Sequence, residues 1–245
     1  MNFTYIVETF FKALAGVPVT LGIMVVSILL SFLPALFLAL GRIYRWPGVS
    51  QFSILYLTFI RSTPPILLIL FFYSLLPSIL NSLLQATSIN VFDIPPILYA
   101  FIIFSLMATA SLSEIIRSAI LTVDSGQLEA ALAIGLSHFQ AYWRIIFPQA
   151  LKSALPNLCN LVINLVKGTS LVFVMTVKDI TAIAKIEAAY GYQYFESYFA
   201  IFIIYIIICG MIQILFSWLE TRAAIAEEVD GLQTGYGKIS VIHGM

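Results

Sequence analysis

Charged side chains are scarce in this 245-residue chain: only 10% of its residues are Asp, Glu, Lys or Arg. The twelve acidic and twelve basic side chains cancel at neutral pH, which excludes a basic face for nucleic acid and an acidic disordered tail. Hydrophobic residues make up 61% of the chain, so a water-soluble domain would lack the polar surface needed to cover itself. The composition therefore predicts a membrane protein.

Cysteine and histidine are also rare, with two of each. Cys159 and Cys209 lie far apart in apolar stretches, without the paired spacing of a zinc site or a disulfide framework, and we interpret both as small core residues. His138 and His243 form no ligand cluster. We therefore expect no metal site and no catalytic residues. An intramembrane enzyme would need a catalytic pair of Asp, His, Ser or Glu within an apolar run, and the sequence contains no such pair.

Long apolar runs dominate the remainder of the chain. Four uncharged runs, at residues 17–40, 62–92, 94–113 and 197–219, each supply the roughly 20 residues that cross a bilayer. A fifth stretch, 155–177, is interrupted only by Lys167, and its asparagines favour packing against other helices over contact with lipid. We expect an all-α membrane protein with five transmembrane helices, the first of them retained and not cleaved as a signal peptide.

The basic residues predict the orientation, because cytoplasmic loops carry an excess of lysine and arginine. With the N-terminus outside and the C-terminus inside, only Lys12, Lys178 and Lys185 lie outside, and Lys167 lies within the membrane. The cytoplasmic set is then Arg42, Arg45, Arg61, Arg117, Arg144, Lys152, Arg222 and Lys238. The reverse orientation violates the rule, so the prediction is N-out and C-in.

The segment before the fifth stretch has a different pattern, with apolar residues at helical spacing from Leu128 to Phe139. Gly135 allows the chain to turn, and Ser137 with Gln140 forms a capping box for a second helix. We expect two short helices outside the membrane that form a compact knob, which fits a groove on a partner protein.

The knob carries a spaced motif, with Glu129-Ala130-Ala131 followed by Gly135, Ile145 and Phe147-Pro148. This resembles the EAA motif of binding-protein-dependent ABC importers, EAA-x3-G-x9-I-x-L-P, with phenylalanine in place of the leucine. An isolated EAA would mean nothing, whereas the full spacing in a cytoplasmic loop before the penultimate span is specific.

Four further segments resemble the polar amino-acid branch of that family, the type-I permeases for histidine, glutamine, arginine and cystine. Residues 56–64 read YLTFIRSTP and resemble Y-x4-RGTP, with Ser62 in place of glycine; residues 113–117 read SEIIR and resemble AExxR. Residues 155–160 read LPNLCN and resemble LPP-x2-N, and residues 167–171 read KGTSL and resemble KDTSL, with Gly168 in place of aspartate. The resemblance extends over about residues 18–222.

The resemblance implies a multi-pass subunit of a bacterial inner membrane with several partners: a second permease subunit, identical or related, two cytoplasmic ATPase subunits, an external solute-binding protein and an amino-acid substrate. The chain contains no G-x4-G-K-[ST] phosphate loop, and residues 167–170 have the wrong order for one. We therefore expect no cofactor in this chain, with ATP and Mg bound by the partner ATPase subunits, and no enzymatic activity of its own.

The resemblance also suggests how the chain is organised. We expect an N-terminal segment at residues 1–16, a permease domain at 17–222 with a coupling loop at about 124–148, and a cytoplasmic tail at 223–245. The residues expected to contact the ATPase are Glu129, Ala130, Ala131, Gly135, Leu136 and Ser137.

Two sets of polar residues fall within or beside the apolar runs. Four charged residues, Arg61, Glu114, Arg117 and Lys167, are assigned a structural role, although a functional role remains equally open for Lys167. Polar residues that could line a substrate pathway, or else join helices, are Ser105, Thr109, Ser113, Asn157, Asn160 and Asn164.

The cargo is the least constrained property. Leu161 stands where the resembled family often has Glu or Gln, which disfavours a basic side chain and favours a neutral polar amino acid such as cystine or a related sulfur compound. A basic amino acid or glutamine remains the alternative within the family. A stand-alone secondary carrier has only Lys167 as a deep titratable group to support it.

Overall fold

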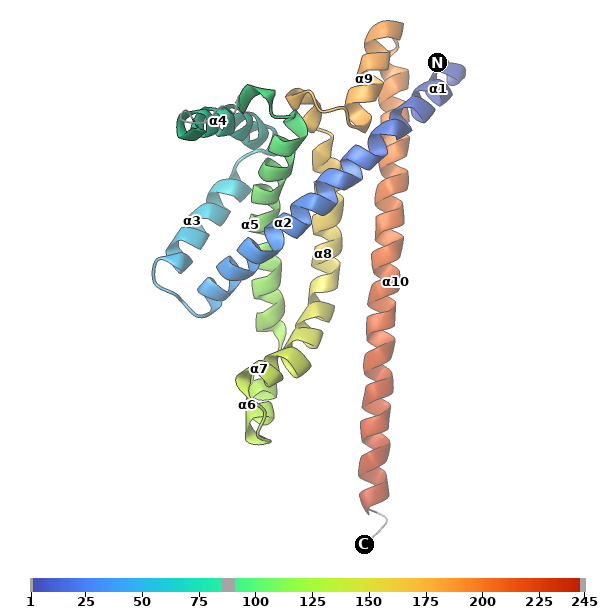
Figure 1. The fold of residues 1–245 in the computed structure, drawn as a ribbon. Coiled ribbons are helices and arrows are strands. Elements are labelled where there is room, and N and C mark those ends of the chain that lie inside the picture. The colour runs from blue at the N-terminus through green and yellow to red at the C-terminus, as the bar shows by residue number, and fades with distance from the viewer. Residues whose placement is uncertain (1, 85–90, 243–245) are drawn as a thin grey trace.

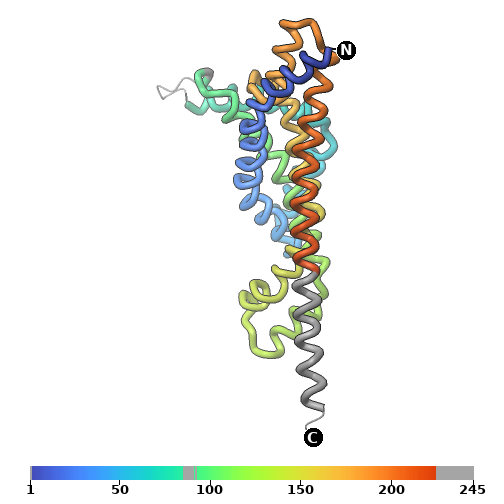
Figure 2. The backbone as a smooth tube through the Cα atoms, turned by 90° about the vertical axis from the view of Figure 1, so that its right-hand side faces the viewer, coloured from blue at the N-terminus to red at the C-terminus, as the bar shows by residue number. Residues whose placement is uncertain are grey.

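The computed structural model describes residues 2–84 and 91–242, and of residues 92 and 225–242 it describes the backbone alone. Its long helices α2 (Val17–Ile43), α5 (Pro96–Thr122), α8 (Phe147–Thr169) and α10 (Tyr194–Ile242) extend between the two ends of the molecule (Figure 1). Helices α1 (Phe3–Ala13) and α9 (Ile180–Gly191) lie at one end. Helices α6 (Ser125–Ala133) and α7 (His138–Ala141) form a knob at the other, far from the N-terminus (Figure 2).

A close backbone approach fixes the N-terminal end of α2. Helix α1 continues into α2 through a 3-10 turn at Leu14–Gly16, and a Cβ atom on Gly16 would lie 2.3 Å from the backbone nitrogen of Ile180. Only glycine permits this contact. On the other side of α1, Lys12 forms an ion pair of 2.7 Å with Glu187 of α9. Helices α1 and α9 therefore pack together.

Helix α4 (Pro65–Leu84) occupies the region of the second predicted span, and α3 (Val49–Ser62) precedes it and points in a different direction (Figure 1). The break between them follows from Pro64 and Pro65, because a proline disfavours helical backbone in the residue before it. Thr63 is accordingly extended, with φ −98° and ψ 132°. Helix α4 ends at Leu84, and residues 85–90 of the predicted run lie outside the described part of the chain.

Within the described residues, four helical segments are long and apolar enough to cross a membrane: Phe3–Ile43, Pro65–Leu84, Pro96–Thr122 and Tyr194–Ala224. Helix α8 takes the place of the predicted stretch 155–177, but it begins eight residues earlier and ends at Thr169, where a 3-10 turn, Val172–Met175, follows. Helix α8 is not one of these four segments, because its polar residues lower its mean hydropathy. The all-helical architecture is confirmed, and the count of five spans stays a prediction.

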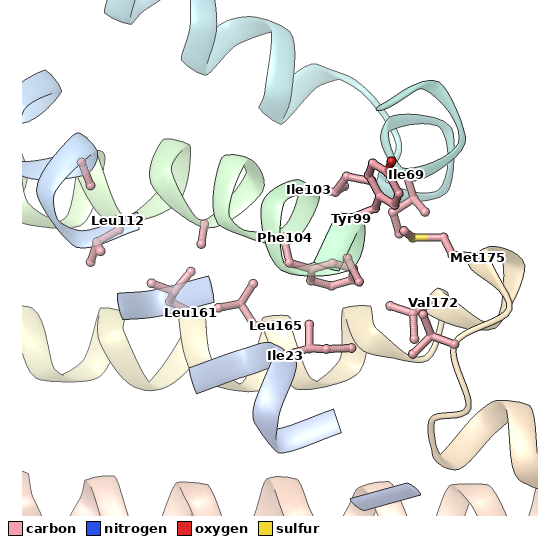
Figure 3. Close-up of a cluster of buried hydrophobic side chains, with 14 of the residues drawn as sticks. Ile23, Ile69, Tyr99, Ile103, Phe104, Leu112, Leu161, Leu165, Val172 and Met175 are labelled. Atoms are coloured by element: carbon pink, nitrogen blue, oxygen red, sulfur yellow. The ribbon is translucent and has the colours of Figure 1, made fainter. Parts of the chain in front are cut away.

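The main core lies where α2, α5 and α8 meet, as Figure 3 shows. Phe104 of α5 is fully buried in the same cluster as Ile23 of α2 and Leu165 of α8. Because lipid tails are as apolar as these side chains, close van der Waals packing holds such helices together. Small buried residues, Ala35 on α2 and Ala100 and Ala108 on α5, allow the helices to approach.

Candidate coupling surface and translocation pocket

The knob has the two short helices predicted from the sequence. Asp124 caps α6, its carboxylate accepting a hydrogen bond of 2.6 Å from the backbone N–H of Gly126. At the other end of α6, Gly135 has φ +86°, and the backbone N–H of Leu136 donates to the carbonyl oxygen of Ala131 at 3.1 Å. Glycine adopts this left-handed conformation at little cost, so Gly135 allows the reversal between α6 and α7.

A capping box then starts α7, as predicted. The side chain of Gln140 accepts a hydrogen bond of 3.0 Å from the backbone N–H of Ser137, and the Ser137 hydroxyl accepts one of 3.3 Å from the backbone N–H of Gln140. This reciprocal pair fixes the start of the second helix.

The knob joins α8 without a loop. Helix α7 continues through a π-helical turn, Tyr142–Ile146, directly into α8, whose first turn contains Pro148. The Tyr142 hydroxyl lies 2.9 Å from that of Tyr44 at the end of α2. Burial and this hydrogen bond raise the pKa of Tyr44 to about 12. A displacement of the knob is thereby linked to both α8 and α2.

Most of the predicted coupling residues are accessible. Glu129, Ala130, Gly135 and Ser137 are exposed, Leu136 is half-buried, and Ala131 is buried against the rest of the knob. Ile134 was not predicted from the sequence as part of this surface, although its side chain is 77% exposed. Phe139 on α7 is exposed to the same extent. Large exposed apolar side chains mark a surface for contact with another protein or with the membrane.

The three predicted asparagines lie together. Asn157, Asn160 and Asn164 follow one face of α8 at helical spacing, and all three are exposed in the single chain. They line a cavity of about 280 Å³, here named the polar pocket, which α3 and α5 complete. Its other polar lining residues are Arg61, Ser111, Glu114 and Ser118.

The predicted serines and threonine of α5 lie elsewhere. Ser105 and Thr109 line a separate, apolar cavity of about 640 Å³ between α2, α3 and α5. The Ser105 hydroxyl donates to the Phe101 carbonyl at 2.5 Å, the Thr109 hydroxyl to the Ser105 carbonyl at 2.7 Å, and the buried Ser113 hydroxyl to the Ala110 carbonyl at 3.0 Å. The three hydroxyls are therefore bonded to their own helix. None of the three residues lines the pocket that contains the asparagines.

Sequence reasoning missed Ser111, which faces the polar pocket from α5. Ser111, Glu114 and Ser118 recur at spacings of three and four and therefore share a face of α5. Glu114 was recognised from the motif, and following its helical face in both directions would have found the two serines.

Two of the four structural charges form ion pairs. Glu114 lies between Arg42 of α2, at 2.5 Å, and Arg117 of its own helix, at 2.6 Å. Arg61 and Lys167 take part in none of the ion pairs that join two described residues. Lys167 lies in the last turn of α8, exposed at the far end of the face that carries the asparagines.

The described residues also bring no group of three or more His, Cys, Asp or Glu together as metal ligands.

Comparison with known proteins places this arrangement in a family. Residues 4–225 match the model of the family described as binding-protein-dependent transport system inner membrane component. The chain belongs to this family. It is 37% identical over 209 residues to the L-cystine transport system permease protein TcyL of Bacillus subtilis, covering 85% of each chain. It is 34% identical over 215 residues to the probable amino-acid permease protein YxeN of the same species, covering 88% of this chain and 92% of YxeN.

A solved structure has the same fold. The crystal structure of an amino acid ABC transporter with histidines aligns with a TM-score of 0.75 at 30% identity, covering 91% of this chain and 99% of that one. The protein is thus the multi-pass inner-membrane permease component of an ABC amino-acid importer. A permease of this family carries no cofactor itself, and the ATPase activity resides in a partner subunit.

Proposed function

We propose that this permease subunit carries a neutral polar amino acid into the cell through the polar pocket of α8. In this proposal five helices span the membrane, with the N-terminus outside and the C-terminus inside. A second permease subunit, identical or related, covers the exposed asparagine face, and the importer also contains ATPase subunits and an external binding protein. The observation that carries the proposal is the line of three asparagines in one cavity of an otherwise apolar bundle.

The physical reason lies in the hydration of the cargo. An amino-acid zwitterion that leaves water without new hydrogen bonds loses several kcal/mol for each stranded polar group. Each asparagine amide offers a carbonyl acceptor and two N–H donors, so the line replaces lost water at successive depths.

The charges around the pocket support a neutral cargo over a basic one. Leu161 lines the pocket where a carboxylate would be needed to hold a cationic side chain. Glu114 is a carboxylate in the lining, but Arg42 and Arg117 already neutralise it. TcyL, a relative at 37% identity, is named for L-cystine, which agrees with a neutral polar cargo.

Coupling to ATP hydrolysis is assigned to the knob, through Glu129, Ala130, Ala131, Gly135, Leu136 and Ser137. Because α7 continues into α8, closure of the ATPase subunits would move the helix that carries the asparagines. The exposed Ile134 and Phe139 are the apolar part of the same contact.

Asn160→Leu tests the pocket. Removing a buried hydrogen-bond partner typically costs about 1 to 3 kcal/mol, which corresponds to about 5-fold to 150-fold slower uptake into proteoliposomes that contain the complete importer. The same change at Asn81, an exposed residue of α4 outside the pocket, is the matched control and should transport normally. Capture by the external binding protein should be unaltered in both variants. Equal uptake by the two variants would remove Asn160 from the pathway.

A further inference from the structure

Arg61 is the charged residue of the pocket region that lacks a partner. It takes part in none of the hydrogen bonds or ion pairs that join two described residues, whereas Arg42 and Arg117 both bind Glu114. Arg61 nevertheless lines three cavities, the polar pocket of about 280 Å³ and two neighbours of about 290 and 340 Å³. The second cavity also shares Ser111 and Asn164 with the polar pocket, and the third shares Glu114.

The position of Arg61 makes the missing partner significant. At 1.5 Å per residue, the helix carries Arg61 roughly 18 Å from the α2–α3 loop, where α3 begins at Val49. Its side chain is exposed in the single chain and faces the cavities that α5 and α8 help to line. Once the second permease subunit of the proposed function covers that face, the guanidinium keeps its charge and favours an anionic acceptor.

The nearby acidic group is already paired with two other arginines. Glu114 is the carboxylate that lines cavities together with Arg61, and its two oxygens accept from Arg42 and Arg117 at 2.5 and 2.6 Å. Leu161 and Gly168, which line the neighbouring cavity, bring no charge. The described lining thus holds one guanidinium in excess, next to amide groups that can bind neutral polar atoms.

We propose that Arg61 binds the α-carboxylate of the transported amino acid, while Asn157, Asn160 and Asn164 contact its remaining polar groups. This inference rests on the proposed function and names the recognition element for the part that all amino acids share. Planar guanidinium and carboxylate groups form two parallel hydrogen bonds, which fix orientation as well as charge. The assignment changes Arg61 from a structural residue to one that binds the cargo.

The test compares an amino acid with its own α-carboxamide, which has the same shape but no negative charge. The detergent-purified importer is used without the external binding protein, so that the ratio reports the membrane subunits alone. The probe is whichever of radiolabelled L-cystine, L-glutamine, L-glutamate and L-arginine the wild-type complex binds. If none binds, and the complete importer with its external binding protein takes up none of them, the proposed function itself is wrong.

For the wild type, the free acid should compete at least about ten-fold better than the carboxamide, the size of one charge-assisted hydrogen bond. Arg61→Gln should bring this ratio close to one while the affinity for the carboxamide stays similar, and Arg61→Lys should keep part of the preference. Arg45→Gln is the matched control, because Arg45 is an exposed arginine that lines none of the three cavities, and it should retain the full ratio. A wild-type ratio near one overturns the assignment without any variant, and so does an Arg61→Gln ratio equal to that of the wild type.

Discussion

At the scale of single residues, Asp179 shows how a buried acidic side chain is held at the N-terminus of α9. Its side chain is fully buried and caps α9, accepting hydrogen bonds of 3.1 and 2.8 Å from the backbone N–H groups of Thr181 and Ala182. Burial raises the pKa of the Asp179 carboxyl above its usual value, although the backbone donors oppose the shift. The residue thus serves as a helix cap at an electrostatic cost.

The sign of this shift predicts a pH dependence. Because the folded pKa of Asp179 lies above the unfolded one, its contribution to stability is fully present below the unfolded pKa and is lost as pH rises through the folded pKa. Asp179→Asn keeps the cap without the charge and should be at least as stable as the wild type at neutral pH, with a weaker pH dependence. Asp179→Ala loses the cap and should cost about 1 kcal/mol.

Thermal unfolding of the detergent-purified protein between pH 4 and pH 8 measures both effects. The alanine variant serves as the control for loss of the cap. If the asparagine variant is as unstable at neutral pH as the alanine variant, burial of the charge is not what distinguishes Asp179.

At the scale of elements, the knob is the part that makes the most specific prediction. Glu129→Lys and Gly135→Trp should leave the subunit in the membrane but prevent its coupling to the ATPase. The first reverses an exposed charge, and the second places a bulky side chain at a left-handed glycine that has open space around it. The expected result is loss of ATPase co-purification and of substrate-stimulated hydrolysis.

Asp93→Lys provides a control for this experiment. Asp93 is also an exposed acid, but it lies in the 3-10 turn Val91–Asp93 before α5, at the opposite end of that helix from the knob. This variant should co-purify with the ATPase as the wild type does. Normal co-purification in both knob variants would count decisively against docking at α6 and α7.

The elements also show how far sequence reasoning reaches. Helix α2 and the knob were predictable because an unbroken apolar run and a capped turn at Gly135 each depend on local chemistry. The break at Thr63 also has a local cause, the two prolines that follow it. The early start of α8 was not predictable, because its first residues, Phe147 to Ala154, are held as helix by continuity with the π-helical turn and by the burial of Ala150 and Ala154.

The same limit applies to the pocket. The spacing of Asn157, Asn160 and Asn164 predicts a shared face, and the structure places them in one cavity. Periodicity alone does not say which face of α5 meets that cavity, so Ser105 and Thr109 were chosen and Ser111 was missed. Arg61 has no ion pair with another described residue because Glu114 pairs with Arg42 and Arg117 instead. Arg42 lies 72 residues before Glu114 in the sequence, so no local pattern predicts this pair.

At the scale of the whole molecule, the orientation predicts which residues are accessible from each side. Single cysteines are introduced at Tyr192 and Ser137, both exposed and at opposite ends, in a chain from which Cys159 and Cys209 have been removed. A membrane-impermeant thiol reagent should label position 192 in intact cells and position 137 only after permeabilisation. The opposite pattern would reverse the topology and remove the knob from the cytoplasm.

The most direct measurement of the central claim is amino-acid uptake by proteoliposomes that contain the complete importer with its external binding protein. The account predicts uptake that requires ATP on the knob side, requires the binding protein, and prefers a neutral polar amino acid to arginine, lysine and histidine. Omitting the ATPase subunits should abolish uptake even when a proton gradient is imposed. Uptake by this permease without ATPase subunits, driven by the proton gradient, would contradict the account, and faster uptake of arginine than of any neutral amino acid would contradict the proposed cargo.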